Sequence, residues 1–282
     1  MLDSVSFIGG GVMAEAMVQG LLSRKLLSNK SITVAEPRQE RRKELEQKYG
    51  IKTTANNREA AKSGKILVFS IKPQDLDSVL LSLKGALRTE QMIMSIVAGA
   101  RVGTIGKGVG HSSVVRVMPN TPAQIGEGMS VWTATRSVSK KQLRQAREIL
   151  QALGKELYVS DEKFLDMATA VSGTGPTYVF LVMEAMVDAA VHLGFPRHVA
   201  YQLVTETMRG SIMYAMKSGK HPAELRNLVT SPGGTSAAAL YQLEKGSLRT
   251  VLSKAIWAAY ERSKSLGKGR NSSVSTNEGE HA

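Results

Sequence analysis

The sequence predicts an α/β protein with an N-terminal doubly wound sheet and an all-helical C-terminal part. Three observations support this fold class. Short apolar runs alternate with helical patterns up to about residue 158, the first run breaks into glycines before a helix, and strand-like runs stop after Asp161. The length of 282 residues and the 42% hydrophobic composition suggest about two domains, each able to bury a core.

The first apolar run, residues 5–8, indicates a buried strand that is followed at once by Gly9, Gly10 and Gly11. Glycines permit a tight turn and the close approach of a pyrophosphate, and the helix that starts at Val12 offers unpaired N–H groups to phosphates. A tight strand-to-helix turn without a ligand would show the same pattern. Its place at the start of a strand-helix-strand unit favours a dinucleotide site of the Rossmann type.

The second predicted strand, residues 32–35, ends at Glu36, where such a sheet meets the adenosine ribose. An acid at this corner favours an unphosphorylated ribose, whereas Arg38, Arg41 and Arg42 favour a 2′-phosphate. We expect NADPH as the cofactor, with Arg38 near the phosphate, and NADH as the alternative. The arginines are also compatible with a charged helix face, because glutamates lie at pairing distances among them.

Later strands are predicted at residues 66–71, 92–97, 114–118 and 131–133, with a helix over 139–153 and a short strand at 157–158. Lys72 and Pro73 follow the strand at 66–71, at the edge of the sheet that faces the ligand crevice. Lys72 is expected to act near the nicotinamide ribose, although a solvated lysine is the alternative. The proline is also compatible with simple strand termination.

The second half shows only helical patterns, expected at residues 162–171, 176–193, 197–216, 222–228, 235–243 and 248–265. These helices carry more apolar surface than a monomer of this size usually buries, which favours an oligomer with a helical interface. The predicted domains are residues 1–158 for the sheet and 159–266 for the helices. Residues 267–282 are rich in Gly, Ser, Asn and Glu and are predicted to be a disordered tail.

The composition excludes several classes of protein. There is no cysteine, which excludes disulfides and thiol chemistry, and the five histidines lack metal-ligand spacing, so no metal site is expected. The chain opens directly into a strand, without room for a signal peptide, and its longest apolar stretch is interrupted by Glu184 and Asp188. We therefore expect a soluble, cytoplasmic protein without a membrane partner.

The formal net charge of +13 is compatible with a nucleic-acid binder or with an enzyme for anionic small molecules. The basic residues are spread along the chain without interleaved aromatics, and aromatics make up only 5% of the composition. Base-stacking surfaces need aromatic side chains. We therefore favour the enzyme and expect no nucleic-acid partner.

A second glycine motif lies between two predicted helices, at residues 229–237. It combines Ser231, Gly234, Thr235 and Ser236 at the start of a helix of small residues. Backbone N–H groups of such a loop can hold a carboxylate without an arginine. The alternative is a capped loop in which a hydroxyl satisfies the first helical turn.

Five motifs occur in order along the chain: Ile8-Gly9-Gly10-Gly11-Val12-Met13-Ala14, Lys72-Pro73-Gln74, Arg116-Val117-Met118-Pro119-Asn120-Thr121-Pro122, Ser172-Gly173-Thr174-Gly175-Pro176 and Thr230-Ser231-Pro232-Gly233-Gly234-Thr235-Ser236. Together they resemble the pyrroline-5-carboxylate reductase family, over about residues 4–266. The last motif is the most specific of the five. The glycine loop alone would not identify the family.

The resemblance implies reduction of 1-pyrroline-5-carboxylate to L-proline, the last step of proline biosynthesis, with NADPH or NADH. It also implies a homodimer formed through the helical domain, possibly assembled into a decamer of five dimers, with each site shared between subunits. A related reductase for another imine or a hydroxyacid, and a nucleotide-binding regulator without catalysis, are the competing hypotheses.

The resemblance also implies roles for individual residues. The cofactor residues would be Ile8, Gly9, Gly10, Gly11, Val12 and Met13 at the pyrophosphate, Asn57 near the adenosine end, and Ser70, Lys72, Pro73 and Ala98 beside the ribose and nicotinamide. The substrate residues would be Glu162, Ser231, Gly234, Thr235 and Ser236, with Ser236 also catalytic through its hydroxyl at the imine nitrogen. Glu162 is equally compatible with an acid favoured by a helix dipole.

The chain departs from the family pattern at three places. Ser236 stands where a second threonine is usual, Leu228 stands where an amide often helps to hold the cofactor, and Gly219-Lys220 replaces an acidic residue. The last two departures put cofactor affinity and substrate contacts in doubt. Arg116 is expected to brace the loop of residues 119–122 through carbonyl groups, a structural role.

Overall fold

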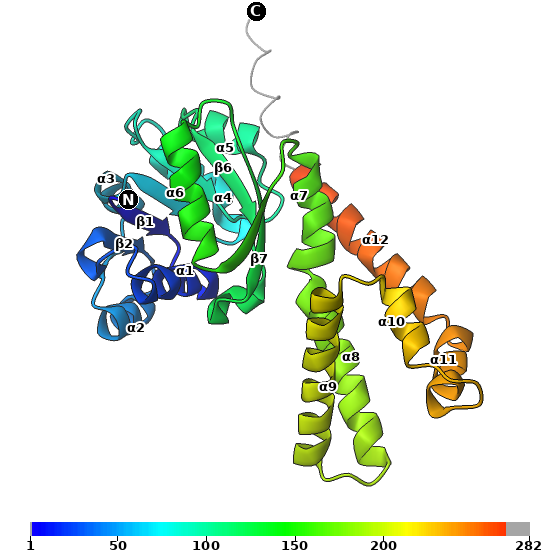
Figure 1. The fold of residues 1–282 in the computed structure, drawn as a ribbon. Coiled ribbons are helices and arrows are strands. Elements are labelled where there is room, and N and C mark those ends of the chain that lie inside the picture. The colour runs from blue at the N-terminus through cyan, green and yellow to red at the C-terminus, as the bar shows by residue number, and fades with distance from the viewer. Residues whose placement is uncertain (1, 269–282) are drawn as a thin grey trace, which may run out of the picture. The chain divides into compact units, whose positions relative to one another are not determined.

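The computed structural model describes residues 2–268, which pack as two compact units (Figure 1). Unit 1 contains residues 2–174 together with residues 259–268, and unit 2 contains residues 175–258. The last helix among the described residues therefore contributes to both units. The functional division predicted at residue 158 stays a prediction.

Unit 1 is built on an eight-stranded sheet with the order β3-β2-β1-β4-β5-β6-β7-β8. The strands are β1 (Val5–Ile8), β2 (Ile32–Ala35), β3 (Lys52–Thr54), β4 (Ile66–Phe69), β5 (Met92–Ser95), β6 (Val114–Met118), β7 (Gly128–Ala134) and β8 (Gly154–Tyr158). Neighbouring strands are parallel except β6 and β7, which are antiparallel. The strand order reverses between β1 and β4, and ligands of such sheets bind outside the carboxyl ends at this point.

Helices cover both faces of this sheet. They are α1 (Val12–Ser23), α2 (Gln39–Tyr49), α3 (Asn57–Ser63), α4 (Leu76–Leu83), α5 (Val102–Val109), α6 (Lys140–Gln151) and α7 (Lys163–Ala168), which continues into a π-helical segment (Thr169–Gly173). Short 3₁₀ turns are η1 (Asn29–Ser31), η2 (Pro73–Asp75) and η3 (Thr121–Ile125). Strand side chains alternate between the faces: Phe7 joins the core under α1 and α6, whereas Ile8 joins the core under α3, α4 and α5. Burial on both faces explains why these strands are continuously apolar.

Two local features determine how closely α1 approaches α6 and where α6 begins. Gly20 brings α1 close to the end of α6, since a β-carbon at residue 20 would lie only 2.9 Å from the carbonyl oxygen of Ala152. Helix α6 begins with a capping box, in which the side chains of Ser139 and Gln142 each accept a hydrogen bond from the other's backbone N–H. The sequence motif therefore sets where α6 starts.

Unit 2 is helical and has a small interior. Its helices are α8 (Gly175–His192), α9 (Arg197–Ser218), α10 (Pro222–Leu228), α11 (Thr235–Lys245) and the first part of α12 (Leu248–Lys268). Among its residues, the buried hydrophobic side chains are Val187, Ala200 and Val204. Large apolar side chains remain exposed on several helices, including Phe180, Leu181, Ile212, Met213, Tyr241 and Trp257. A single copy of unit 2 leaves much of its apolar surface uncovered.

The predicted fold class is confirmed, with three differences in detail. The sheet has an additional edge strand, β3, and β7 begins at Gly128 rather than at residue 131. Helix α12 extends to Lys268, so it includes the first two residues of the segment predicted as a tail. The rest of that segment, residues 269–282, lies outside the described residues.

Residues 2–268 show neither a membrane-spanning helix nor a cluster of metal ligands. No helix among them has both the length and the apolar character needed to cross a membrane. No group of three or more His, Asp or Glu side chains in the same residues is arranged to hold a metal ion.

Candidate functional site

The glycine loop between β1 and α1 makes a tight turn with open space beside its last glycine. Gly9 has φ +100°, and its N–H donates to the carbonyl of Ala35 at 2.8 Å. A β-carbon at Gly9 would lie 2.7 Å from the carbonyl oxygen of Ser70, so only glycine fits there. A β-carbon at Gly11 would meet nothing within 4 Å, so the space beside Gly11 is open.

The start of α1 leaves its first backbone N–H groups available to a ligand. Gly11 is the N-cap residue, and within the described chain no side chain caps this helix. Val12 and Met13 are the first two residues of the helix, and their N–H groups have no partner inside it. The open space and the positive end of the helix dipole together suit a phosphate.

The peptide groups of Gly10 are held by side chains from β2 and α2. Its N–H donates to Glu36 Oε2 at 3.0 Å, and its carbonyl accepts from Arg41 Nε at 2.8 Å. Arg41 also donates to Glu15 and, at 2.9 Å, to Glu44. Gly10 N–H is thus engaged within the protein, and Arg41 is engaged with the loop and with two carboxylates rather than with solvent.

Glu15 anchors this arrangement beneath the glycine loop. Partial burial alone would raise the pKa of its carboxyl, but hydrogen bonds from Lys48, Arg41 and Tyr49 lower that pKa to about 2. Glu15 therefore stays ionised at neutral pH and keeps Arg41 in place.

The end of β2, where the sequence predicts the adenosine ribose, combines the buried acid Glu36 with the exposed Arg38. Glu36 is 5% exposed, and its Oε1 accepts from the N–H of Arg38 at 3.2 Å and from Arg38 Nε at 2.8 Å. Burial opposes ionisation of Glu36, but the bonds from Arg38 and Gly10 prevail and hold its pKa below the usual value. Within residues 2–268, the terminal nitrogens of Arg38 have no protein partner, and Arg42 Nη1 is bonded to the carbonyls of Glu36 and Pro37.

The remaining predicted cofactor residues lie at the carboxyl ends of strands or just after them. The hydroxyl of Ser70, next to β4, donates to the carbonyl of Gly9 at 2.7 Å, and Lys72 and Pro73 begin η2. Ala98 lies in the turn after β5, half-buried. Asn57 begins α3, and its Nδ2 lies 3.4 Å from the hydroxyl of Ser82.

Glu162 is half-buried and belongs to a cluster of charged groups with the buried residues Arg116 and Asp166. Its Oε1 accepts from the N–H of Val102 at 2.8 Å and from Arg116 Nη1 at 2.9 Å, and Arg116 Nη2 donates to Asp166 Oδ1 at 3.0 Å. The expectation that Arg116 braces residues 119–122 through carbonyls is wrong, because two carboxylates bind its guanidinium. The residue that does hold this loop is Asn120, which bonds to the carbonyl of Ser172 and the N–H of Met129.

Asp166 was not predicted from the sequence. It is 7% exposed, and a buried aspartate in a helix usually has a charged partner. Its place next to Leu165, inside an apolar helical pattern, was the available signal.

The second glycine motif, between α10 and α11, also presents uncapped helix N–H groups. The N–H of Gly234 donates to the carbonyl of Ser231 at 3.1 Å, and Gly233 has φ +70°. Gly234 is the N-cap of α11, which no described side chain caps. Thr235 and Ser236 are the first residues of α11, and both are exposed. The cradle predicted for a carboxylate is open to solvent.

The predicted site residues divide between the two units. All the cofactor residues and Glu162 lie in unit 1, whereas Ser231, Gly234, Thr235 and Ser236 lie in unit 2.

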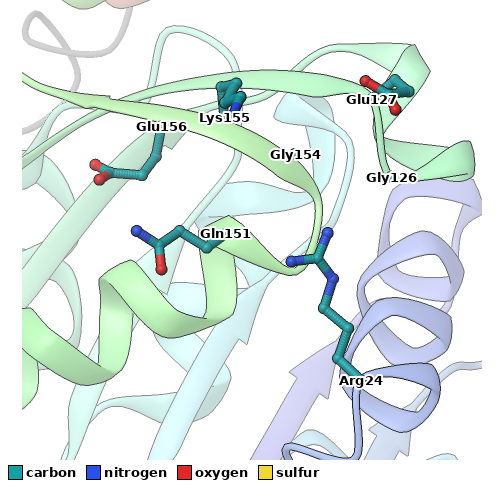
Figure 2. Close-up of a pocket in the computed structure, with 7 residues that line it drawn as sticks. All are labelled: Arg24, Gly126, Glu127, Gln151, Gly154, Lys155 and Glu156. Atoms are coloured by element: carbon teal, nitrogen blue, oxygen red, sulfur yellow. The ribbon is translucent and has the colours of Figure 1, made fainter.

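A surface pocket of about 480 Å³ lies elsewhere in unit 1 (Figure 2). It is formed where α1 and α6 end and β8 begins, with Arg24, Gln151 and Gly154 among its lining residues. It includes no predicted site residue. Its one well-anchored acid, Glu156, already accepts from Trp132 Nε1 at 2.6 Å and pairs with Arg147. We therefore place the candidate site at the glycine motifs and not here.

Two family models match the parts of the chain that contain the two glycine motifs. The family model for pyrroline-5-carboxylate reductase dimerisation matches residues 162–266, and a model for NADP oxidoreductase, coenzyme F420-dependent, matches residues 4–99. The pyrroline-5-carboxylate reductase of Synechocystis sp. is 40% identical, over 95% of this chain and 100% of that protein. The enzyme of the same name from Pisum sativum is 36% identical, over 93% of this chain and 96% of that protein.

Solved structures give the same result. A pyrroline-5-carboxylate reductase from Coxiella burnetii is 35% identical with a TM-score of 0.86, covering 95% of this chain and 100% of that one. Pyrroline carboxylate reductase from Plasmodium falciparum, solved with NADP bound, is 31% identical with a TM-score of 0.88 and the same coverage of both chains.

Proposed function

The chain belongs to the pyrroline-5-carboxylate reductase family, and from this membership we propose that it reduces 1-pyrroline-5-carboxylate to L-proline with NAD(P)H, as the last step of proline biosynthesis. The observation that carries the proposal is the pair of uncapped helix starts behind glycines, at α1 and at α11. One suits a pyrophosphate and the other a small carboxylate. Both ligands are needed for this reaction.

We propose that unit 1 holds the cofactor. The first N–H groups of α1, at Val12 and Met13, would bind the pyrophosphate, which approaches over Gly9 and Gly11. Ser70, Lys72, Pro73 and Ala98 would contact the ribose and nicotinamide, and Asn57 would lie toward the adenosine end. When bound, the reduced nicotinamide supplies a hydride to the carbon of the C=N bond.

We propose that the start of α11 holds the substrate carboxylate. The N–H groups of Thr235 and Ser236 would bind its oxygens, while Ser231 and Gly234 shape the loop. A carboxylate fixed at this helix start orients the ring of the substrate. The entropy cost of aligning the ring is then met on binding, which lowers the activation barrier. Glu162 would lie near the substrate. Its Oε1 is already bonded to Val102 and Arg116, so Oε2 would be the oxygen that faces the substrate.

The hydroxyl of Ser236 is proposed to orient the imine nitrogen and to hand on a proton that comes finally from solvent. The reaction is easier when this nitrogen is protonated, and a hydroxyl can both donate and accept. Within unit 2, the Ser236 hydroxyl makes no hydrogen bond to the protein, so it is available to the substrate.

Assembly follows from the exposed apolar helices. The chain forms a homodimer through the helical part, which matches the dimerisation model of the family. The cofactor residues and the substrate loop lie in different units, and we propose that the homodimer brings a sheet and a substrate loop together. A decamer of five dimers and a cytoplasmic location stay predictions from the sequence.

The direct test is the loss of reduced-nicotinamide absorbance on adding 1-pyrroline-5-carboxylate, measured with NADPH and then with NADH. Substrate-dependent oxidation with proline as the product would support the proposal. A folded protein that binds NADPH and oxidises it only with another imine would contradict the assigned substrate. Binding of NADPH without turnover of any imine would instead support a regulator.

Arg38 gives a separate prediction about the choice of cofactor. Glu36 is buried and fully bonded inside the protein, whereas the terminal nitrogens of Arg38 face outward, so we expect a preference for a 2′-phosphate. Arg38→Ala should weaken binding of 2′,5′-ADP about 10- to 100-fold, the usual range for a charge-assisted hydrogen bond, and leave binding of AMP unchanged. Isothermal titration calorimetry measures both.

Lys43→Ala is the matched control for Arg38→Ala. It removes the same charge at an exposed position of α2, the helix that Arg38 precedes as N-cap residue, so it reports long-range electrostatics alone. If both variants weakened 2′,5′-ADP equally, Arg38 would have no direct role. If Arg38→Ala weakened AMP as much as 2′,5′-ADP, the phosphate assignment would be wrong.

A further inference from the structure

We propose that Asp166 and Ser263 are positioning residues for the nicotinamide end of the cofactor. They act through Arg116, Glu162 and the end of α12 on the turn of residues 96–101, which carries Ala98. The inference rests on the proposed function, because that function places Ala98 beside the nicotinamide. Neither residue is proposed to touch the substrate or the cofactor.

The C-terminal end of the turn is fixed by Glu162. Helix α5 starts directly after the turn, at Val102, and Glu162 Oε1 accepts the N–H of Val102 at 2.8 Å. An acid at a helix N-terminus is stabilised by the dipole as well as by the hydrogen bond. Since Glu162 lies 60 residues further along the chain, this contact ties the turn to the start of α7.

Glu162 is in turn fixed by the sheet through Arg116. The side chain of Arg116 is 4% exposed and donates to Glu162 at 2.9 Å and to Asp166 at 3.0 Å. Arg116 lies opposite Ser95 in the β5–β6 register, and Ser95 is the last residue of β5 before the turn. Arg116 thus pairs through its backbone with the residue just before the turn, and its side chain is bonded to Glu162, which holds the end of the turn.

Asp166 connects this cluster to α12. Its Oδ1 accepts from Arg116 and also from the hydroxyl of Ser263, at 3.1 Å, and the Ser263 side chain is buried. The two donors share one oxygen, so removing either leaves the other bond in place. Asp166 therefore sets the position of both Arg116 and α12.

One turn after Ser263, α12 packs directly on the middle of the turn of residues 96–101. Gly99 has φ +72°, and a β-carbon on it would lie 2.9 Å from the β-carbon of Leu266. A β-carbon on Gly267 would lie 3.2 Å from the carbonyl oxygen of Gly99. The turn is consequently held at its end by Glu162 and at its middle by Leu266. Asp166 is bonded to Arg116, which binds Glu162, and to Ser263, which lies on the same helix as Leu266.

The test separates the two ends of the cofactor. Isothermal titration calorimetry would measure the Kd of NADPH and of 2′,5′-ADP, which has the adenosine end without the nicotinamide, for Ser263→Ala and Asp166→Asn. We expect the Kd of NADPH to rise about tenfold, the size of one lost hydrogen bond to a charged group, and the Kd of 2′,5′-ADP to stay constant. The KM for NADPH should rise with little change in kcat.

Ser265→Ala is the control, because Ser265 lies on the same helix, is exposed and bonds only within its own turn. It should change neither Kd. Ser263→Ala keeps the Arg116–Asp166 pair, so it tests the proposal even if Asp166→Asn does not fold.

Two results would overturn the proposal: an equal rise in both Kd values, which indicates a general loss of structure, or no rise in either. Failure of the proposed function can be told apart from failure of the positioning role, because cofactor binding is measured without an imine. A wild-type protein that binds NADPH more tightly than 2′,5′-ADP but reduces no pyrroline carboxylate would contradict the proposed reaction and leave the positioning role standing.

Discussion

Ser236→Ala should lower kcat about 100-fold, the lower end of the range for loss of a positioned proton-transfer group. The hydroxyl at the start of α11 would no longer orient the imine nitrogen, whereas the backbone N–H groups that hold the carboxylate are unchanged. The Kd of NADPH should therefore stay constant, and the KM for the imine should change little. Steady-state kinetics and calorimetry measure the three quantities.

Ser236→Thr is the matched variant. It keeps the hydroxyl and adds the methyl group found at this position in the usual family pattern, so it should retain most of the activity. Equal activity in Ser236→Ala and the wild type would remove Ser236 from the mechanism. Equal losses in the alanine and threonine variants would show that the position, and not the hydroxyl, matters.

Arg116→Met should lower the free energy of unfolding by about 3–5 kcal/mol, the usual cost of removing one partner from a buried ion pair. The guanidinium lies between Glu162 and Asp166, and its loss leaves two carboxylates close together without a counter-charge. Thermal unfolding followed by circular dichroism should show a melting temperature lower by about 10 °C.

A triple variant tests the electrostatic cause. Arg116→Met combined with Glu162→Gln and Asp166→Asn removes all three charges and keeps an acceptor for the N–H of Val102 and the hydroxyl of Ser263. It should recover much of the lost stability, since no unpaired charge remains. A triple variant less stable than Arg116→Met alone would show that packing, and not charge, dominates at this cluster.

The sheet could be predicted because most of its strands are buried on both faces. Burial on both faces makes a strand continuously apolar, as in residues 66–69, and the sequence shows this directly. Strand β3 could not be found in this way, because its three residues, Lys52–Thr54, are polar and lie at the sheet edge. The pairing of β3 with β2 depends on contacts that no local pattern reports.

The glycine motifs could likewise be predicted, because their geometry is a local property of the chain. The arrangement of the arginines could not. Arg38, Arg41 and Arg42 look alike in the sequence, but Arg41 is bonded to Gly10 and Glu15, which lie 31 and 26 residues away. Arg116 pairs with carboxylates 46 and 50 residues away. Only the folded chain distinguishes a guanidinium that faces solvent from one that supports a loop.

The bond between Glu36 and the N–H of Gly10 has a consequence for protein engineering. Altering the acid at the end of the second strand is a common idea for changing the preference between two nicotinamide cofactors. Here that substitution would also remove one of the bonds that hold the glycine loop, because one carboxylate orients Arg38 through Oε1 and holds Gly10 through Oε2. Cofactor selectivity and the conformation of the phosphate-binding loop therefore cannot be changed independently in this chain. A redesign of cofactor selectivity must supply a new acceptor for the N–H of Gly10.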